Sequence, residues 1–370
     1  MRIQSIHIQG FRNLITQTVE LSDGINLLVG DNGQGKTNLL EALHVLATLR
    51  SFRASNLRDL IHHEAKEAEL LGEVFADEIP LKMRLRIDGK GRQLWLGDKA
   101  VRSVAEYLGS LSVVAFTPDD LSMIKGAPAL RRRFIDRAAF LFRPSHLQAV
   151  RDFSTSLKAR NRLLQEDRAG KDPALLASFS ELLAEAGSKV SATRAWLIEM
   201  LSPRIGEILS FLSDGHIRAQ LRFQAGWKHD SSFSKESLAE ALDQGLERDR
   251  RRGTTGTGPQ GDDLDVILNQ ASARRYASQG QQRAVAVALM LAVVDSAVSS
   301  GAEQPVILLD DVSSELDALR RERLFERVRA FGGQVLITAT EAKLVEPVYE
   351  KAAQVLTVHE GRIEQASGGL

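Results

Sequence analysis

The sequence predicts an α/β protein in which both ends of the chain form one head domain and a helical second domain is inserted between them. A strand pattern at residues 25–29 leads directly into a glycine-rich loop and a helix pattern at 36–49. Strand signals are missing from about residue 143 to 212, where apolar residues take helical spacing. Strands and helices then alternate again, which indicates a parallel sheet. We therefore expect a discontinuous head at 1–119 and 261–370 and a helical domain at 120–260.

The first third of the chain is rich in strand patterns. Apolar or alternating runs predict strands at 2–8, 18–21, 25–29, 70–75 and 81–87. The tetrapeptide Asp88-Gly89-Lys90-Gly91 is typical of a hairpin turn.

The middle of the chain carries an apolar seam with the alternating three- and four-residue steps of packed helices. It predicts a long helix over 176–200 and a weaker one over 147–164, with a turn signal at 170–173. Arms of this length, about 38 Å at 1.5 Å per residue, favour a packed helical hairpin over a protruding arm. The charged and then Gly/Thr-rich segment 248–263 is interpreted as a linker or mobile loop.

The last third returns to alternating elements. Its patterns predict a strand at 306–309, a helix at 318–331 and further strands at 334–338 and 354–358.

Composition excludes several classes of protein. Lys+Arg and Asp+Glu balance at 48 each, so the overall charge gives no argument for a nucleic-acid partner. The chain has no cysteine, which excludes a disulfide framework and a thiolate metal site. The N-terminus lacks the apolar core of a signal peptide, and the longest apolar run, 284–294, is too short to span a bilayer. We expect a cytoplasmic protein without a membrane partner.

A phosphate-binding loop follows the strand at 25–29. It matches the pattern GxxxxGK[ST], in which glycines let backbone N–H groups wrap a phosphate and the next helix adds its positive N-terminal dipole. Lys36 is expected to reach the β- and γ-phosphates of ATP, and the Thr37 hydroxyl to bind Mg²⁺. The predicted ATP-binding residues of this loop are Gly30, Asp31, Asn32, Gly33, Gln34, Gly35, Lys36 and Thr37.

Two carboxylates follow the apolar strand predicted at 306–309. Asp310 is the candidate for the Mg²⁺ shell, and Asp311 for activating the attacking water. A buried strand can also end in Asp merely to cap a turn, but the phosphate loop elsewhere in the chain favours the catalytic interpretation.

The segment Ser278-Gln279-Gly280-Gln281 opens the apolar helix that extends to about residue 298. Ser278 stands where a helix N-cap belongs, and capping alone would explain it. The order of phosphate loop, helical insertion, this segment and then the two carboxylates instead resembles an ABC-type head. By that resemblance Ser278 and the helix start of one subunit contact the γ-phosphate held by the other, so Ser278 is a candidate catalytic residue beside Lys36 and Asp311.

Further blocks resemble the RecF family of ABC/SMC-type P-loop ATPases and extend along the whole chain. They are GFRNL at 10–14, PDDL at 118–121, KGAP at 125–128, RRRFID at 131–136 and YASQGQQR at 276–283. The resemblance implies a weak ATPase that dimerises on ATP and binds double- and single-stranded DNA at gaps or junctions. It further implies cooperation with RecR and RecO in loading RecA, and a place for Arg12 near the nucleotide.

Some positions depart from these patterns. The segment GPQGDD at 258–263 stands where the family usually has GPHRDD, and the strands ending at Thr117 and Ala339 lack the Gln and switch His common in ABC ATPases. Slow hydrolysis would follow from these losses. The alternatives are a transporter-type ABC subunit and an SMC-like DNA tether.

Candidate DNA contacts are clusters of arginine, which pairs bidentately with phosphate. Aromatic residues make up only 5% of the chain, which favours backbone contacts without sequence readout over base stacking. The clusters are Arg50, Arg53 and Arg58; Arg131–Arg133 with Arg137; Arg248 with Arg250–Arg252; and Arg320, Arg321 and Arg323.

Overall fold

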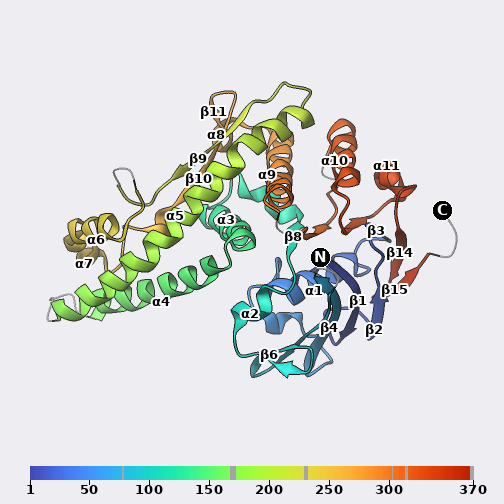
Figure 1. Ribbon diagram of the computed structural model, residues 1–370, viewed down its shortest axis with the longest axis horizontal. Helices are drawn as coiled ribbons and strands as arrows, with labels where there is room; N and C mark the ends of the chain where they lie inside the picture. The colour runs from blue at the N-terminus through green and yellow to red at the C-terminus, as the bar shows by residue number, and fades with distance from the viewer. Residues whose placement is uncertain (77–78, 167–171, 229–231, 302, 313–315, 367–370) are drawn as a thin grey trace. The chain divides into compact units, whose positions relative to one another are not determined.

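The computed structural model describes the chain except for residues 77–78, 167–171, 229–231, 302, 313–315 and 367–370. The chain divides into two compact units (Figure 1). Unit 1 comprises Met1–Ser122, Phe211–Gly215 and Gln279–Leu370, and unit 2 comprises Met123–Ser210 and His216–Ser278. The return to the head, expected at residue 261, therefore comes later in the structure, because residues 261–278, which contain two strands and a short helix, belong to unit 2.

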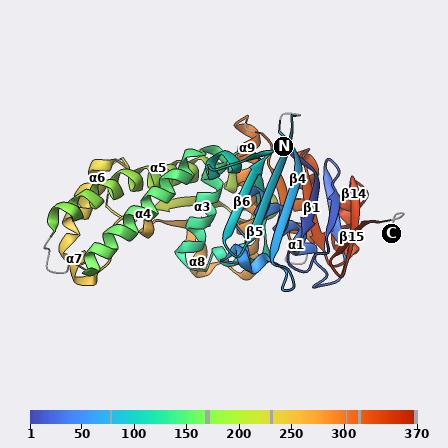
Figure 2. The same cartoon turned by 90° about the horizontal axis from the view of Figure 1, so that it is seen from below.

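An antiparallel sheet forms one layer of unit 1. Its central strands β1, β4, β5 and β6 lie side by side in Figure 2. Buried and less buried residues alternate along β4 and β5, as expected where one face of a sheet covers a core. The strand order is β2 (Gln17–Glu20), β1 (Arg2–Gln9), β4 (Glu67–Ala76), β5 (Ile79–Asp88), β6 (Gly91–Leu96) and β7 (Lys99–Ala100).

The second sheet of unit 1 is mostly parallel, which confirms the predicted α/β class. Its strands β3, β12 and β13 are buried along their whole length, as expected of parallel strands covered on both faces. Only β15 runs antiparallel to its neighbour. The strand order is β15 (Arg362–Gln365), β14 (Gln354–His359), β3 (Ile25–Val29), β13 (Val335–Ala339), β12 (Val306–Leu309) and β8 (Val113–Phe116).

Helix α1 (Lys36–Thr48) joins the two sheets, because it contacts β4 and β5 of the first and β8 and β13 of the second. Its leucines are buried, and a Cβ on Gly72 of β4 would meet the Leu46 side chain at 2.5 Å, so the helix and strand pack closely. The other helices of unit 1 are α2 (Val104–Leu108), α9 (Gln279–Ser299), α10 (Ala318–Phe331) and α11 (Glu346–Tyr349).

Helix α9 is the one helix among the described residues that is long and apolar enough to cross a bilayer. In the structure 72% of the apolar stretch of α9 is buried against the rest of the protein. A core helix has this composition for packing reasons alone.

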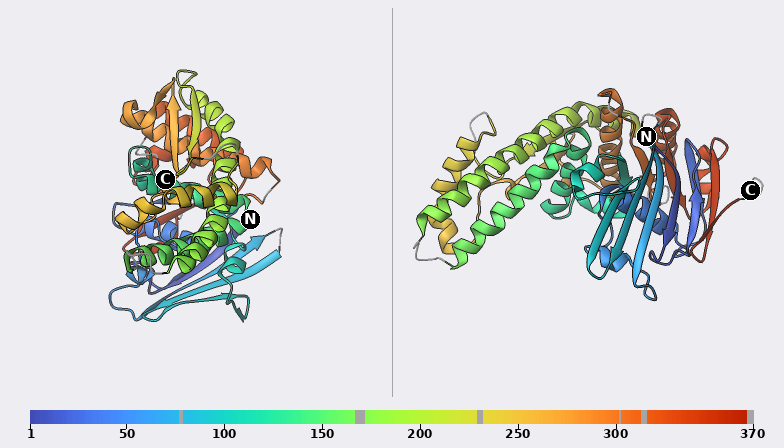
Figure 3. Two further views of the ribbon diagram at one scale, coloured as in Figure 1. Left: turned by 90° about the vertical axis from the view of Figure 1, so that its left-hand side faces the viewer. Right: turned by 60° about the horizontal axis from the view of Figure 1, so that its bottom comes forward.

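Unit 2 is mainly helical and contains a long helical hairpin. Helices α4 (Ser145–Glu166) and α5 (Pro173–Leu212) run side by side in Figure 1 and in the right-hand view of Figure 3. Helix α5 has 40 residues and extends well beyond the predicted end at residue 200. Two residues of the predicted turn, 170 and 171, lie outside the described part of the chain. The remaining elements are α3 (Pro128–Phe142), α6 (Lys235–Gln244), α7 (Leu246–Arg252), α8 (Ala273–Tyr276), and the sheet of β11 (Ala271–Ser272), β10 (Asp263–Leu268) and β9 (Ala219–Gln224).

The hairpin is covered by other parts of unit 2. Phe153 of α4 and Leu183 of α5 share one buried cluster with Leu238 and Leu242 of α6 and with Trp227. This packing agrees with the predicted helical subdomain.

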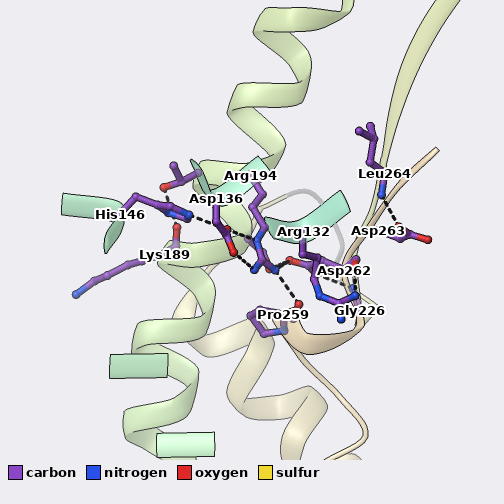
Figure 4. Close-up of polar contacts among 12 residues, drawn as sticks. Arg132, Asp136, His146, Lys189, Arg194, Gly226, Pro259, Asp262, Asp263 and Leu264 are labelled. Carbon is purple, nitrogen blue, oxygen red and sulfur yellow. Dashed lines mark hydrogen bonds and ion pairs between the residues drawn. The ribbon is translucent and has the colours of Figure 1, made fainter. Parts of the chain in front are cut away.

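The prediction of a linker or mobile loop at 248–263 is wrong. Its carboxylates Asp249 and Asp262 are fully buried, each 2.9 Å from an arginine nitrogen, of Arg160 and Arg194 respectively. Figure 4 shows Asp262 and Arg194 with Asp136, whose two oxygens accept from Arg194 at 2.8 and 2.9 Å. Buried carboxylates need such partners, and these come from distant helices that local composition does not reveal.

Candidate nucleotide site

The phosphate loop joins β3 to α1 at the carboxyl edge of the parallel sheet, where α/β proteins commonly bind ligands. Its three glycines all have positive φ, 154° at Gly30, 80° at Gly33 and 120° at Gly35. A Cβ at Gly30 would lie 2.4 Å from the carbonyl oxygen of Val358, and one at Gly35 would lie 2.9 Å from the Leu14 side chain. Glycine is therefore required at these two positions for both conformation and space.

Lys36 is 6% exposed, and its Nζ donates to the carbonyl oxygens of Gly30 at 2.5 Å and Asp31 at 2.7 Å. Burial lowers the pKa of Lys36, while Asp311, Asp310 and Asp31 act in the opposite direction. The Lys36 ammonium thus lies inside its own loop, where the negative charges of the three carboxylates favour its protonated form. This is the geometry of a cation that binds the phosphates of a nucleotide.

Asp310 directly follows β12 and is 5% exposed. Its Oδ1 accepts from the hydroxyls of Thr37 at 2.8 Å and Thr338 at 2.9 Å. Burial raises the pKa of Asp310, and the two hydroxyls oppose that change. The structure therefore brings together the two predicted magnesium ligands, Thr37 and Asp310. Hard oxygen ligands of this kind suit Mg²⁺.

Asp311 adopts the left-handed conformation, with φ of 47°. Its backbone N–H donates to the hydroxyl of Thr338 at 2.8 Å. Sequence reasoning missed Thr338, since an apolar strand that ends in threonine carries no motif.

The turn between β14 and β15 braces the phosphate loop, which sequence reasoning also missed. The N–H of Gly361 donates to the carbonyl oxygen of Gln34 at 2.9 Å, and that of Glu360 to the Gln34 side chain at 2.6 Å. On the other side, the amide of Asn13 donates to the carbonyl oxygen of Gly33 at 3.1 Å. The loop is thus held in shape by residues from both ends of the chain.

Gly361→Ala is expected to weaken ATP binding at least about tenfold, equivalent to about 1.4 kcal/mol. The residue has φ of 78°, and a Cβ there would lie 2.0 Å from the Asn13 carbonyl oxygen, so the turn must leave the phosphate loop. Titration calorimetry with ATP measures the loss. Gly332→Ala is the matched control, because φ is also positive but nothing lies within 4 Å of the added Cβ. Equal ATP affinity in the two variants would show that the turn between β14 and β15 does not hold the phosphate loop in its binding conformation.

Arg12 binds protein groups near the phosphate loop. Its Nε and Nη2 donate to the buried Glu41 at 2.9 and 3.0 Å, and Nη1 donates to the carbonyl oxygen of Asp59. A direct contact of Arg12 with nucleotide stays a prediction. Arg53, placed by sequence among candidate DNA contacts, donates to Asn38 at 2.9 Å, and its charge acts to lower the pKa of Asp310. Arg53 therefore belongs to the surroundings of the nucleotide site.

The segment predicted to contact a second subunit lies at the start of α9. Ser278 directly precedes the helix, and Ser278 and Gln279 are exposed while Gln281 is partly buried. A Cβ on Gly280 would lie 3.1 Å from Nη1 of Arg320, a residue paired with Asp317 at 2.6 Å. The exposed helix start leaves Ser278 accessible to another molecule.

The arginine clusters proposed from sequence differ in their surroundings. Arg131 is 2% exposed and paired with Asp263 at 2.6 Å, so this residue is structural. Arg323 pairs with Asp214 and Glu326. Arg251 and Arg252 at the end of α7 are exposed, which keeps that cluster a candidate.

These features define a P-loop ATPase head of the ABC/SMC type, with glycine cradle, buried lysine and paired hydroxyl and carboxylate suited to Mg·ATP. The match to the family described as RecF/RecN/SMC N terminal domain covers residues 2–364. The chain is 37% identical to the DNA replication and repair protein RecF of Myxococcus xanthus, over 98% of this chain and 97% of that protein. It is 38% identical to RecF of Anaeromyxobacter sp. over 94% of each chain.

Solved structures agree with the sequence comparison. The recombination mediator protein RecF, as RecF-ATPrS in the RecFOR pathway, superposes with a TM-score of 0.89 at 29% identity, covering 99% of this chain and 98% of that one. An Smc head bound to a domain of ScpA shares the fold, with a TM-score of 0.60 at 19% identity. The chain belongs to the RecF family.

Proposed function

We propose that the chain is an ATP-gated DNA-binding protein of recombinational repair in the cytoplasm. Two copies bind one another around two Mg·ATP, hold gapped or junction DNA without reading its sequence, and separate after slow hydrolysis. The observation that carries this proposal is the pair of complementary features in one chain: a braced phosphate site and an exposed α9 start with Ser278. Work with RecO and RecR in RecA loading belongs to the proposal, supported by relatives in the RecFOR pathway.

Each residue has a role in this scheme. The phosphate loop and Lys36 bind the β- and γ-phosphates, and Thr37 and Asp310 would hold Mg²⁺, which would supply charge neutralisation at the phosphates. Asp311 orients the attacking water and accepts its proton. Ser278 and the N-terminus of α9 from the second copy donate to the γ-phosphate, so that ATP links the two copies.

Sedimentation with and without ATP and gapped DNA tests the whole scheme. We expect monomers without nucleotide, dimers with ATP, and a larger complex when DNA is added. A monomer that retains DNA equally well without ATP would contradict ATP gating.

Asp311→Asn should keep Mg·ATP bound but slow hydrolysis by about 10²- to 10⁴-fold, because an amide cannot accept the proton of the attacking water. A single-turnover assay with radiolabelled ATP measures the rate, and nucleotide affinity is measured in parallel. Asp98→Asn, an exposed aspartate on a turn, is the control. A normal rate in Asp311→Asn would remove Asp311 from the mechanism.

DNA affinity should fall steeply with salt and depend little on sequence. Arginine contacts to phosphates release counterions, which gives a log–log slope of about −0.9 for each phosphate neutralised. Fluorescence anisotropy with two unrelated gapped duplexes between about 50 and 200 mM salt measures both properties. Binding that is independent of salt, or that differs strongly between the two sequences, would disagree with backbone recognition.

A further inference from the structure

Thr338 contacts both carboxylate residues of the nucleotide site, Asp310 and Asp311. It lies near the end of β13, the strand between β3 and β12, and is 1% exposed. In the register of the sheet Ile337 pairs with Leu309, so Thr338 is level with Asp310, the next residue along. The same strand pairs Thr338 with Leu28 of β3, two residues before the phosphate loop.

One hydroxyl group makes both contacts. Thr338 Oγ1 donates its hydrogen to Asp310 Oδ1 at 2.9 Å and accepts the N–H of Asp311 at 2.8 Å. A hydroxyl has one hydrogen to donate and two lone pairs to accept with, so the two contacts do not compete. Buried N–H groups need a partner, and here a side chain provides it where the chain has left the sheet.

The contact to Asp311 matters because of the backbone conformation. Asp311 has φ of 47°, a region that residues other than glycine adopt at a cost of about 1–2 kcal/mol. The hydrogen bond from its N–H to a fixed acceptor helps to hold this conformation. Thr338 is that acceptor. The direction in which the Asp311 side chain points therefore depends on a residue of β13, the strand next to β12.

The contact to Asp310 complements that of Thr37. Both hydroxyls donate to the same oxygen, Oδ1: Thr37 from the start of α1, and Thr338 from β13, the direct neighbour of β12 in the sheet. Thr37 belongs to the binding machinery of the phosphate loop, whereas Thr338 contacts no part of that loop in the hydrogen bonds of the described residues. Thr338 can thus position the carboxylates without taking part in nucleotide binding.

We propose that Thr338 is a positioning residue for ATP hydrolysis, which acts by fixing Asp310 and Asp311 relative to each other. This inference rests on the proposed function, in which Asp311 accepts the proton of the attacking water. Thr338 affects the rate of the chemical step and leaves nucleotide affinity and ATP-induced dimerisation largely unchanged.

The test uses two substitutions with opposite properties. Thr338→Val keeps the shape and loses the hydroxyl, whereas Thr338→Ser keeps the hydroxyl and loses the methyl group. If the hydroxyl positions the carboxylates, single-turnover hydrolysis falls about 10- to 100-fold in Thr338→Val, as expected for loss of a hydrogen bond to a charged group. Hydrolysis in Thr338→Ser stays within about threefold of wild type, and ATP affinity stays within about threefold in both variants.

Thr117→Val is the matched control. Thr117 is also a buried threonine at the end of a parallel strand, but its hydroxyl donates to Asp120 at 3.1 Å. The Thr117→Val variant is expected to hydrolyse ATP at the wild-type rate. If Thr338→Val fails to fold in a thermal melt, Thr338→Ala removes the same hydroxyl and takes its place.

Two results would overturn the inference: a wild-type hydrolysis rate in Thr338→Val, or a defect in Thr338→Ser as large as that in Thr338→Val, which would mark a packing role. Failure of the underlying scheme looks different, because Asp311→Asn would then hydrolyse ATP normally. A slow Asp311→Asn beside a normal Thr338→Val rejects only the role of Thr338.

Discussion

Lys36→Ala is expected to abolish ATP binding, with a loss of affinity of at least about 100-fold. The Lys36 ammonium is 6% exposed and lies among the carbonyl oxygens of its own loop, close to three carboxylates. Without it, the negative charge of the nucleotide would meet Asp310 and Asp311 with less compensating positive charge. A hydrogen bond to a charged group contributes about 1.5–3 kcal/mol, and in the proposed scheme Lys36 contacts both the β- and the γ-phosphate.

Titration calorimetry with Mg·ATP measures this affinity. Lys36→Arg keeps the charge but has a planar fork that misfits the cradle, so it should bind and hydrolyse ATP poorly. Lys90→Ala, on the exposed turn between β5 and β6, is the control. Normal nucleotide affinity in Lys36→Ala would show that the phosphate loop is not the ATP site.

Ser278→Arg is expected to leave ATP affinity of the monomer near normal and to eliminate the ATP-induced dimer. The substitution removes the hydroxyl and places a long side chain at the exposed start of α9, where the proposed scheme puts the γ-phosphate of the second copy. The phosphate loop of the same chain is untouched. Hydrolysis and ATP-dependent retention of DNA should therefore be lost together, each by at least about 100-fold.

Analytical ultracentrifugation with and without ATP measures the dimer, and calorimetry measures nucleotide affinity. Ser178→Arg, an exposed serine on α5, controls for the added charge and bulk. If Ser278→Arg still dimerises with ATP, Ser278 is a helix cap and no more. If its monomer no longer binds ATP, Ser278 acts within its own chain, and the gated mechanism is wrong.

The sequence predicts well those features that depend on neighbours along the chain. The phosphate loop, the strand before Asp310 and the long amphipathic helices each have a local pattern, and the structure places Thr37 and Asp310 2.8 Å apart across 273 positions. Helix α5 extends beyond the predicted end at residue 200 even though Pro203, normally a helix-ending signal, lies inside it.

Features that depend on distant partners could not be predicted. Asp249 and Asp262 look like residues of a solvated loop until Arg160 and Arg194 are placed beside them. Neither Gly361 nor Thr338 belongs to a sequence motif. Gly361 matters because its N–H donates to the carbonyl oxygen of Gln34, and Thr338 matters because its hydroxyl donates to the carboxylate of Asp310. Tertiary hydrogen bonds of this kind leave no periodic trace in a single sequence.

The order of strands in the parallel sheet has a consequence for synthesis on the ribosome. Strand β3, made within the first 29 residues, has β13 and β14 as its neighbours, and these begin at residues 335 and 354. Both edges of β3 therefore lack their native partners until β13 and β14 have been translated. Until then this apolar segment has two unpaired edges open to other strands, and the nucleotide site is incomplete before β13, which carries Thr338, has joined the sheet.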